Sequence, residues 1–308
     1  MLFIAGYEEN ASGDKQACYW TYITDTGSTT KTNLGNSTDP SEATSVSSRD
    51  GGLYIGGWEG SNDYYWTYTV GSGGTPVKHA ITDYDNDYNG KVHGIYANPD
   101  EDIYLVGEHY SQPTSWNPNN SGQAYLQGGS GRANDLFFND TSYDYFVVGT
   151  ITSTNPDEAV LWINPDGTLP DGISLTSGTY DATATSIFEY ETELYIGGWE
   201  NTSSGSNGYY WIYTNEGAGT LTKHAITGYN TYTKVYSLCI NFDNEELYLV
   251  GKDYGQPTSW NSNNSGQAYL AIESGGSGAA YDLFCAEDSS EDFYVDGYAH
   301  SSKDFASL

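Results

Sequence analysis

Apolar and polar residues alternate along this chain in short segments that close on glycine. Alternation with a period of two, in segments rich in β-branched and aromatic residues, is typical of half-buried strands. No stretch of the chain shows a sustained helical period. The clearest segments read apolar, aromatic, apolar, small and glycine, and they occur seven times, at residues 2–6, 53–57, 103–107, 145–149, 194–198, 247–251 and 293–297. The pattern predicts an all-β protein.

Two sets of residues show that the chain is built from repeats of about 50 residues. The first set is formed by the closing glycines Gly6, Gly57, Gly107, Gly149, Gly198, Gly251 and Gly297. The second set is formed by Trp20, Trp66, Trp116, Trp162, Trp211 and Trp260. We interpret both sets as structural, because glycine permits close approach of two backbones and tryptophan fills the space between sheets.

Each repeat is predicted to contain four short strands, A to D. Strand B is the glycine segment, strand A precedes it, strand C carries the tryptophan, and strand D follows a polar turn. Four short antiparallel strands per repeat, separated by Gly, Asn and Asp turns, are what the blades of a β-propeller require. The sequence predicts one propeller domain over residues 1–308, with seven blades that begin near residues 1, 43, 92, 133, 184, 235 and 281.

A longer duplication lies over the short repeat, and the chain ends bear on the number of blades. The second repeat resembles the fifth, with the same seven residues at 53–59 and 194–200, and the third resembles the sixth, with the same six residues at 112–117 and 256–261. The given sequence begins with a strand B, at residues 2–6, and ends soon after the last strand B, at residues 293–297, so the first and last repeats are each incomplete. A six-bladed propeller is therefore the alternative to seven blades.

The repeats resemble two groups of known propellers. The double glycines at 56–57 and 197–198 and the later strands with Tyr and Trp resemble Kelch-like propellers. Residues 2–7 and 17–20 resemble repeats of secreted proteins and lipoproteins from bacteria such as spirochaetes and Bacteroidetes. The resemblance implies a propeller at the cell surface or outside the cell, reached through a leader that has been removed, and it implies no reaction.

The charge of the chain excludes some partners. With 41 acidic residues against 10 Lys and Arg, the net charge is -31, so the chain would be repelled by a nucleic-acid backbone. No run approaches the roughly 20 apolar residues of a membrane span, so no membrane insertion is expected. The three cysteines form no C-x-x-C pair and are predicted to be small buried residues outside any disulfide framework.

Many of the acids fall in the hairpins between strands A and B, which all emerge on one face of a propeller. We expect this face to be negatively charged and solvated. Its acids are Asp50, Asp100, Glu101, Asp102, Asp140, Asp144, Glu189, Glu191, Glu193, Asp243, Glu245, Glu246, Glu287, Asp288, Glu291 and Asp292.

The opposite face carries the B–C and D–A loops and is rich in tyrosine. Aromatic rings with amide and hydroxyl neighbours suit stacking on, and hydrogen bonding to, a sugar or a protein loop. Loops on a rigid scaffold are also where binding residues concentrate. The predicted ligand-binding residues are Tyr84, Tyr88, Tyr110, Gln112, Tyr229, Tyr232, Tyr254 and Gln256.

One segment has the start of a calcium-binding loop. Asp85, Asp87 and Asn89 place oxygen atoms at alternate positions before Gly90, as in an EF-hand loop. The twelfth position is Tyr96 instead of the bidentate Glu that such loops use. We therefore expect no cofactor, with Ca²⁺ at these three residues as the alternative.

The sequence contains few features that are typical of enzymes. No G-x-S-x-G, P-loop or H-E-x-x-H motif occurs, and His79 and His224 are equivalent positions of two repeats, which favours packing over catalysis. The sequence predicts a non-catalytic extracellular or cell-surface module that binds a glycan or a protein. The alternatives are a propeller hydrolase or lyase that acts on polysaccharide, and a structural component of a surface layer or filament whose copies self-associate.

Overall fold

All elements of the described chain are β-strands. The structure is a computed structural model that describes residues 2–23, 26, 28–35, 39–81, 90–98, 100, 102–117, 122–164, 172–214, 219–226, 232–241, 245–261, 268–269, 277–285 and 293–300. The chain divides into two compact units, one of residues 1–147 and 162–172 and the other of residues 148–161 and 173–308. The division passes through the fourth sheet, so the first three sheets belong to the first unit and the last three to the second.

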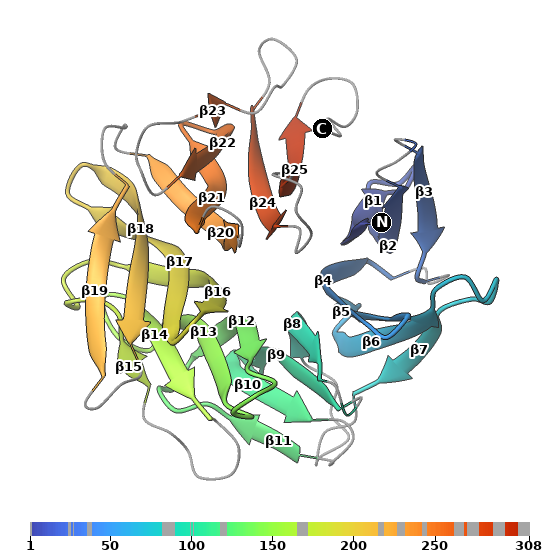
Figure 1. The fold of residues 1–308 in the computed structure, drawn as a ribbon, viewed down its shortest axis with the longest axis horizontal. Coiled ribbons are helices and arrows are strands. Elements are labelled where there is room, and N and C mark those ends of the chain that lie inside the picture. The colour runs from blue at the N-terminus through green and yellow to red at the C-terminus, as the bar shows by residue number, and fades with distance from the viewer. Residues whose placement is uncertain are drawn as a thin grey trace. The chain divides into compact units, whose positions relative to one another are not determined.

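The first three sheets have three, four and four strands, joined in sequence order by antiparallel pairing. Figure 1 labels these strands. Their strands are β1 (Leu2–Glu9), β2 (Lys15–Ile23) and β3 (Ser28–Asn33); β4 (Ser41–Arg49), β5 (Gly52–Glu59), β6 (Asn62–Thr69) and β7 (Val77–Ala80); and β8 (Gly90–Ala97), β9 (Ile103–His109), β10 (Gln112–Asn117) and β11 (Gly122–Tyr125).

The remaining sheets follow the same plan, with four, four, four and two strands. Their strands are β12 (Gly131–Phe138), β13 (Tyr145–Ile151), β14 (Glu158–Ile163) and β15 (Ile173–Ser174); β16 (Ala182–Tyr190), β17 (Glu193–Thr202), β18 (Gly205–Thr214) and β19 (Thr220–Ala225); β20 (Thr233–Asn241), β21 (Glu246–Asp253), β22 (Gln256–Asn261) and β23 (Ala268–Tyr269); and β24 (Ser277–Cys285) and β25 (Phe293–His300).

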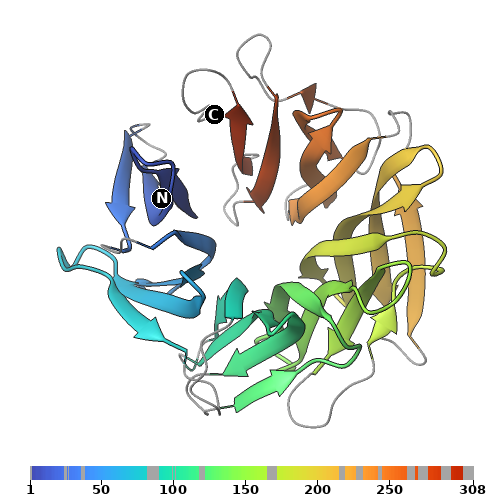
Figure 2. The same ribbon diagram turned by 180° about the vertical axis from the view of Figure 1, so that it is seen from behind.

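The predicted all-β fold of antiparallel, mostly four-stranded blades is confirmed. Each of the seven sequence repeats forms one sheet whose strands pair in chain order (Figures 1 and 2). The first sheet has strands B to D, the next five have strands A to D, and the seventh has strands A and B among the described residues. Six sheets have three or four strands and agree with the six-bladed alternative, whereas the seventh repeat contributes the pair β24 and β25 among the described residues. Within each unit, neighbouring sheets pack through their first strands, as β4 does against β8 and β20 against β24.

A β-bulge in the first strand explains the closing glycine of four repeats. The pairing of the first two strands shifts register at the same place in several sheets, between Val92 and Gly94 in the third and between Val235 and Ser237 in the sixth. The closing glycines Gly107 and Gly251 lie opposite Val92 and Val235. A Cβ atom on either glycine would overlap the carbonyl oxygen of Lys91 or Lys234, two positions before the bulge residue. The structural interpretation of the glycines is confirmed at these positions.

The repeated tryptophans form the centres of the hydrophobic clusters between sheets. Trp66, Trp162 and Trp211 are fully buried, and Trp116 and Trp260 nearly so, whereas Trp20 is half-buried. Trp66 packs with Leu53 and Ile55 of its own sheet and with residues of the preceding sheet, such as Tyr19. Side chains that join two sheets in this way hold neighbouring blades together within a unit.

The cysteines divide into two kinds. Cys18 is free and buried, and burial raises the pKa of its thiol to about 12. Cys239, in β20, is disulfide-bonded. Cys239 is buried as expected, but the expectation that it lies outside any disulfide is wrong, because spacing in the sequence does not show which residues the fold brings together.

Candidate functional site

The B–C hairpins of the third and sixth sheets present tyrosines to solvent. Tyr110 follows β9 and Tyr254 follows β21, and both residues have left-handed backbone with φ of 49°. The next residues, Ser111 and Gly255, also have positive φ, as in the type I′ turns that join two strands through two residues. The side chains of Tyr110 and Tyr254 are 45% and 54% exposed.

The structure brings together two of the predicted ligand-binding residues, Tyr232 and Tyr254. Their ring centroids lie 5.1 Å apart with an interplanar angle of 57°, and both rings are about half exposed. The backbone N–H of Tyr254 donates to the carbonyl of Tyr232, and Tyr232 forms a bridge to Ser206 of β18. These backbone contacts fix Tyr232 between the fifth and sixth sheets.

The other predicted site residues are placed less closely or lie outside the described part. Gln256 begins β22 in the second unit, and Tyr110 and Gln112 belong to the first unit, where the Tyr110 ring packs edge-on against His109 at 4.5 Å. The predicted residues outside the described part are Tyr84, Tyr88 and Tyr229, together with the calcium candidates Asp85, Asp87 and Asn89.

Two lysines and a tryptophan beside the tyrosine pair were missed by the sequence interpretation. The Lys234 ammonium lies over the Trp199 ring, 3.3 Å from its centroid. Lys234 is paired directly with Lys252 across β20 and β21, so both lysines project from the same face of the sheet. We define the aromatic–lysine cluster as Trp199, Tyr232, Lys234, Lys252 and Tyr254.

A signal for this cluster is present in the sequence. Tyr232 and Lys234 are two residues apart, as are Lys252 and Tyr254. The first pair lies where β20 begins and the second where β21 ends, so the antiparallel pairing of the two strands brings both pairs to the same end of the sheet. Aromatic residues in loops are common in binding sites, whereas a lysine at the end of a strand is ordinary on a protein surface and gives no such signal.

The third sheet carries a counterpart of this cluster. The Lys91 ammonium lies 4.8 Å from the centroid of the Trp58 ring, in the same arrangement as Lys234 and Trp199. Lys91 is paired across the strands with Glu108, where Lys234 is paired with Lys252. The counterpart in the third sheet thus has one lysine and one glutamate, at the end of the strands where Tyr110 lies.

Carboxylates close to the aromatic–lysine cluster have partners of their own. Glu200, next to Trp199, is buried and forms an ion pair with Lys223, whose ammonium also lies 3.8 Å from the centroid of the Tyr209 ring. Asp253, next to Lys252, is fully buried and accepts a hydrogen bond from the Thr233 hydroxyl at 3.3 Å. Neither carboxylate is directed at solvent beside the two lysines.

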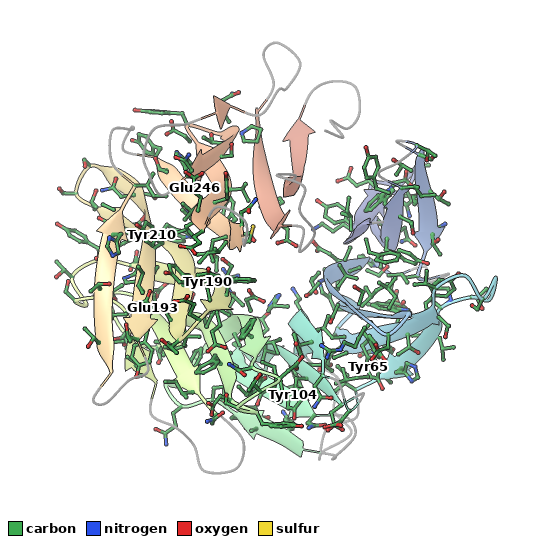
Figure 3. All side chains as sticks on the ribbon, viewed as in Figure 1. Tyr65, Tyr104, Tyr190, Glu193, Tyr210 and Glu246 are labelled. Atoms are coloured by element: carbon green, nitrogen blue, oxygen red, sulfur yellow. The ribbon has the colours of Figure 1, made fainter. Side chains whose placement is uncertain are left out.

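The acids of the A–B hairpins lie at the other ends of the strands. Tyr190, Glu193 and Glu246, labelled in Figure 3, belong to or adjoin these hairpins in the second unit. The Tyr195 hydroxyl donates to Glu193 at 2.9 Å, and burial together with this carboxylate raises the pKa of Tyr195. The Tyr248 hydroxyl donates to Glu246 at 2.9 Å in the same way.

One of these acids is neutralised in the first unit. Arg49 donates to Asp140 at 2.7 Å, and the Tyr96 hydroxyl donates to the other oxygen of Asp140 at 3.2 Å. The three residues come from the second, third and fourth sheets, so they link three repeats. Burial, followed by the charge of Asp140, raises the pKa of Tyr96 to about 12.

The described residues hold neither a metal-binding group nor a membrane-spanning helix. The described residues hold no group of three or more His, Cys, Asp or Glu side chains placed to bind a metal ion. The calcium candidates lie outside the described residues, although the carboxylate of the fully buried Asp63 lies against Gly90, which follows them in the sequence. In the part of the chain that was placed, no helix is long and apolar enough to cross a bilayer.

Comparisons with known proteins agree with this architecture. No protein-family model matches the chain, and no curated protein matches its sequence. Among solved structures, the chain is similar to hydrazine synthase of Kuenenia stuttgartiensis, with a TM-score of 0.59 and 10% identity over 82% of this chain and 72% of that one. It is similar to a chain of the mitotic checkpoint complex, with a TM-score of 0.55 and 14% identity over 86% and 77%.

TolB from Acinetobacter baumannii is similar at a TM-score of 0.51 and 12% identity, and here the match covers 84% of this chain and 60% of TolB. Identities this low carry no information on ligands or activity. Together with the repeated antiparallel sheets, the similarities show that this chain has the β-propeller fold.

Proposed function

We propose that this chain is a non-catalytic binding module that recognises a glycan through the tyrosines of its B–C hairpins. The observation that carries the proposal is the pair Tyr232 and Tyr254, two rings in contact that remain about half exposed. Tyrosine has only two side-chain torsions to restrain, so it supplies a large contact area at a low entropic cost. Its ring can stack on the C–H face of a sugar while its hydroxyl bonds to a sugar hydroxyl.

The scaffold around the pair suits recognition by a preformed surface. Tyr254 occupies a two-residue turn, and Tyr232 is tied by its backbone to both β18 and Tyr254. Residues on short turns between paired strands lose little freedom on binding, and this reduces the cost of association. Exposed aromatic rings grouped on one surface are also unusual unless they contact a partner.

We infer an extracellular or cell-surface location for this module, in keeping with the resemblance to Kelch-like repeats of secreted bacterial proteins. The disulfide at Cys239 supports this location, because structural disulfides form and persist in oxidising compartments. A surface with a net charge of -31 also suits a protein that must stay dispersed outside the cell.

A glycan array tests the proposal with the double variant Tyr232→Ala/Tyr254→Ala. We expect the wild-type protein to bind at least one glycan and the variant to lose at least tenfold in affinity, since stacked aromatic residues dominate such contacts. Tyr143→Ala is the matched control, because Tyr143 is 61% exposed in an A–B hairpin. Equal binding by wild type and double variant would contradict the proposal, as would binding to no glycan at all.

A further inference from the structure

We propose that the third sheet holds a second saccharide site, formed by the rings of Tyr110 and Tyr125 and positioned by the buried His109. The inference rests on the proposed glycan-binding function and adds a site in the first unit, together with the chemistry of the sugar that it takes. It is carried by two exposed tyrosines that both contact one buried histidine ring.

The three side chains meet at one end of the third sheet. His109 ends β9, Tyr110 follows it in the hairpin, and Tyr125 ends β11, which runs in the same direction as β9. His109 is buried, whereas Tyr125 is 40% exposed. The Tyr110 ring lies 4.5 Å from the His109 ring, edge-on, and the Tyr125 ring lies 5.8 Å from it at an angle of 18°. The same buried side chain therefore holds both exposed rings.

Hydrogen bonds at Nδ1 of His109 decide how the Tyr125 hydroxyl can meet a ligand. The Gln123 amide N–H donates to this nitrogen at 2.9 Å, so Nδ1 carries no proton and acts as an acceptor. The Tyr125 hydroxyl, 2.7 Å from the same nitrogen, therefore donates its proton to it. A hydroxyl oxygen has two lone pairs, so it can also accept a hydrogen bond from a ligand. The site thus requires a ligand that donates.

The backbone around the two tyrosines is held in place by neighbouring strands. Tyr110 and Ser111 form a two-residue turn with positive φ, and the Ser111 carbonyl accepts from the N–H of Gly131 at 2.7 Å. The N–H of Leu126, the residue after Tyr125, donates to β10 at 2.8 Å. A site that is already ordered loses little conformational freedom when it binds.

The duplicated sixth sheet does not repeat this arrangement. Asp253 occupies the position of His109, because each is paired with the glutamine that begins the next strand, Gln256 or Gln112. A carboxylate has no ring that could contact a tyrosine and no nitrogen that could accept the proton of a tyrosine hydroxyl. The site is therefore distinct from that of Tyr232 and Tyr254.

The chemistry of the site favours a neutral sugar over a proline-rich peptide, which also docks on exposed aromatic residues. A pyranose offers a C–H face for a tyrosine ring and hydroxyls that donate to the Tyr125 oxygen. Proline offers an apolar ring but has no N–H to donate. Because Nδ1 carries no proton, the His109 ring is neutral, and no charged ligand is required.

The test uses the intact protein with the substitutions Tyr232→Ala/Tyr254→Ala, so that calorimetric titration reports on the remaining site. The probes are cellohexaose, mannohexaose, chitohexaose, their permethylated forms and decaproline. We expect at least one hexasaccharide to bind at one site per chain, more weakly than to wild type. Permethylation removes the hydroxyl donors and keeps the sugar rings, so it should weaken this binding about tenfold.

Further substitutions in the same protein locate the remaining site. Tyr110→Ala should abolish the binding, and Tyr125→Phe, which keeps the ring and removes the hydroxyl, should weaken it about fivefold. Tyr180→Ala is the matched control, because Tyr180 is 38% exposed, and it should leave the affinity unchanged.

Each contrary result separates this inference from the function on which it rests. If wild type binds a glycan but Tyr232→Ala/Tyr254→Ala binds none, the second site is overturned and glycan binding stays intact. The second site is also overturned if Tyr110→Ala and Tyr125→Phe bind as tightly as their parent. Tighter binding of decaproline than of any hexasaccharide overturns the choice of a sugar, and equal binding of the permethylated form overturns the role of the Tyr125 hydroxyl. A wild type that binds no glycan overturns both proposals.

Discussion

The second and third sheets and the fifth and sixth sheets are two copies of one design that differ in charge at one end of the strands. In both copies a tryptophan lies under a lysine of the following sheet, Trp58 under Lys91 and Trp199 under Lys234. In both, a two-residue hairpin presents a tyrosine with the same backbone angle. The residue opposite the lysine differs, because it is Glu108 in one copy and Lys252 in the other.

The interior of the two copies is held by the same contacts. The hydroxyl of the bulge residue Thr44 donates to the carbonyl of Gly56 in its own sheet and to that of Val92 in the next. Thr185 makes the equivalent bonds to Gly197 and Val235. The difference between the copies therefore teaches that packing between sheets restricts the interior, whereas residues at the rim can change charge without disturbing it.

The largest effect is expected where the two copies are the same. Gly251→Ala and Gly107→Ala should each destabilise the protein by about 3 kcal/mol, because the new methyl group would overlap the carbonyl of Lys234 or Lys91. Gly122→Ala is the control, since that glycine has open space around it. Denaturant unfolding measures the three variants, and a loss below about 1 kcal/mol at Gly251 or Gly107 would refute the role of the bulge.

A second, smaller effect is a difference between the two copies in how the free energy of unfolding depends on pH. The bulge residue is His93 in the third sheet and Tyr236 in the sixth. Burial, with Arg132 and Lys91 nearby, lowers the pKa of His93 to about 4, whereas an unfolded histidine titrates near 6.5. Below pH 6.5 the unfolded chain therefore binds more protons than the folded one, and stability falls as pH falls from about 6.5 to 4.

The measurement compares wild type with His93→Gln across this pH window. The wild type should lose about 2 kcal/mol more than the variant between pH 7 and pH 4, in view of the partial exposure of His93. Parallel stability curves for the two proteins would show that His93 has an ordinary pKa in the folded state.

The smallest effect concerns the residue opposite the lysine, Glu108 in one copy and Lys252 in the other, and it tests this difference directly. Glu108→Lys gives the third sheet the lysine pair of the sixth, beside Trp58 and Tyr110. We expect this variant to be less stable than wild type by about 0.5 kcal/mol, because two like charges would lie opposite each other where Lys91 and Glu108 are paired. Glu158→Lys, in β14, makes the same change of charge elsewhere and should change stability less in denaturant unfolding. A similar loss in both variants would mean that net charge, and not the cross-strand pair, controls the effect.

The repeated architecture could be predicted from the sequence because its signals are local. Alternation of apolar and polar residues decides which face of a strand is buried, and this requires no knowledge of distant residues. The glycines and tryptophans recur at one period because each repeat solves the same packing problem. The predicted A to D order of strands is confirmed wherever the described residues extend.

The candidate site could be predicted only in part. The sequence singled out Tyr232 and Tyr254, and the structure places their rings 5.1 Å apart. It did not single out Lys234, Lys252 and Trp199, because their relation depends on strand register and on how one sheet packs against the next. A register set by a bulge cannot be read from spacing, since one inserted residue changes every later pairing.

Periodicity along the chain thus gave the strands, the repeats and the propeller fold, because hydrophobic patterning acts within each segment. Packing between segments fixed the rest: the carbonyls that require glycine at Gly107 and Gly251, the disulfide at Cys239, and the two lysines that are paired across β20 and β21. These features join residues from different strands, and their separation in space follows from the folded backbone and not from their separation in sequence.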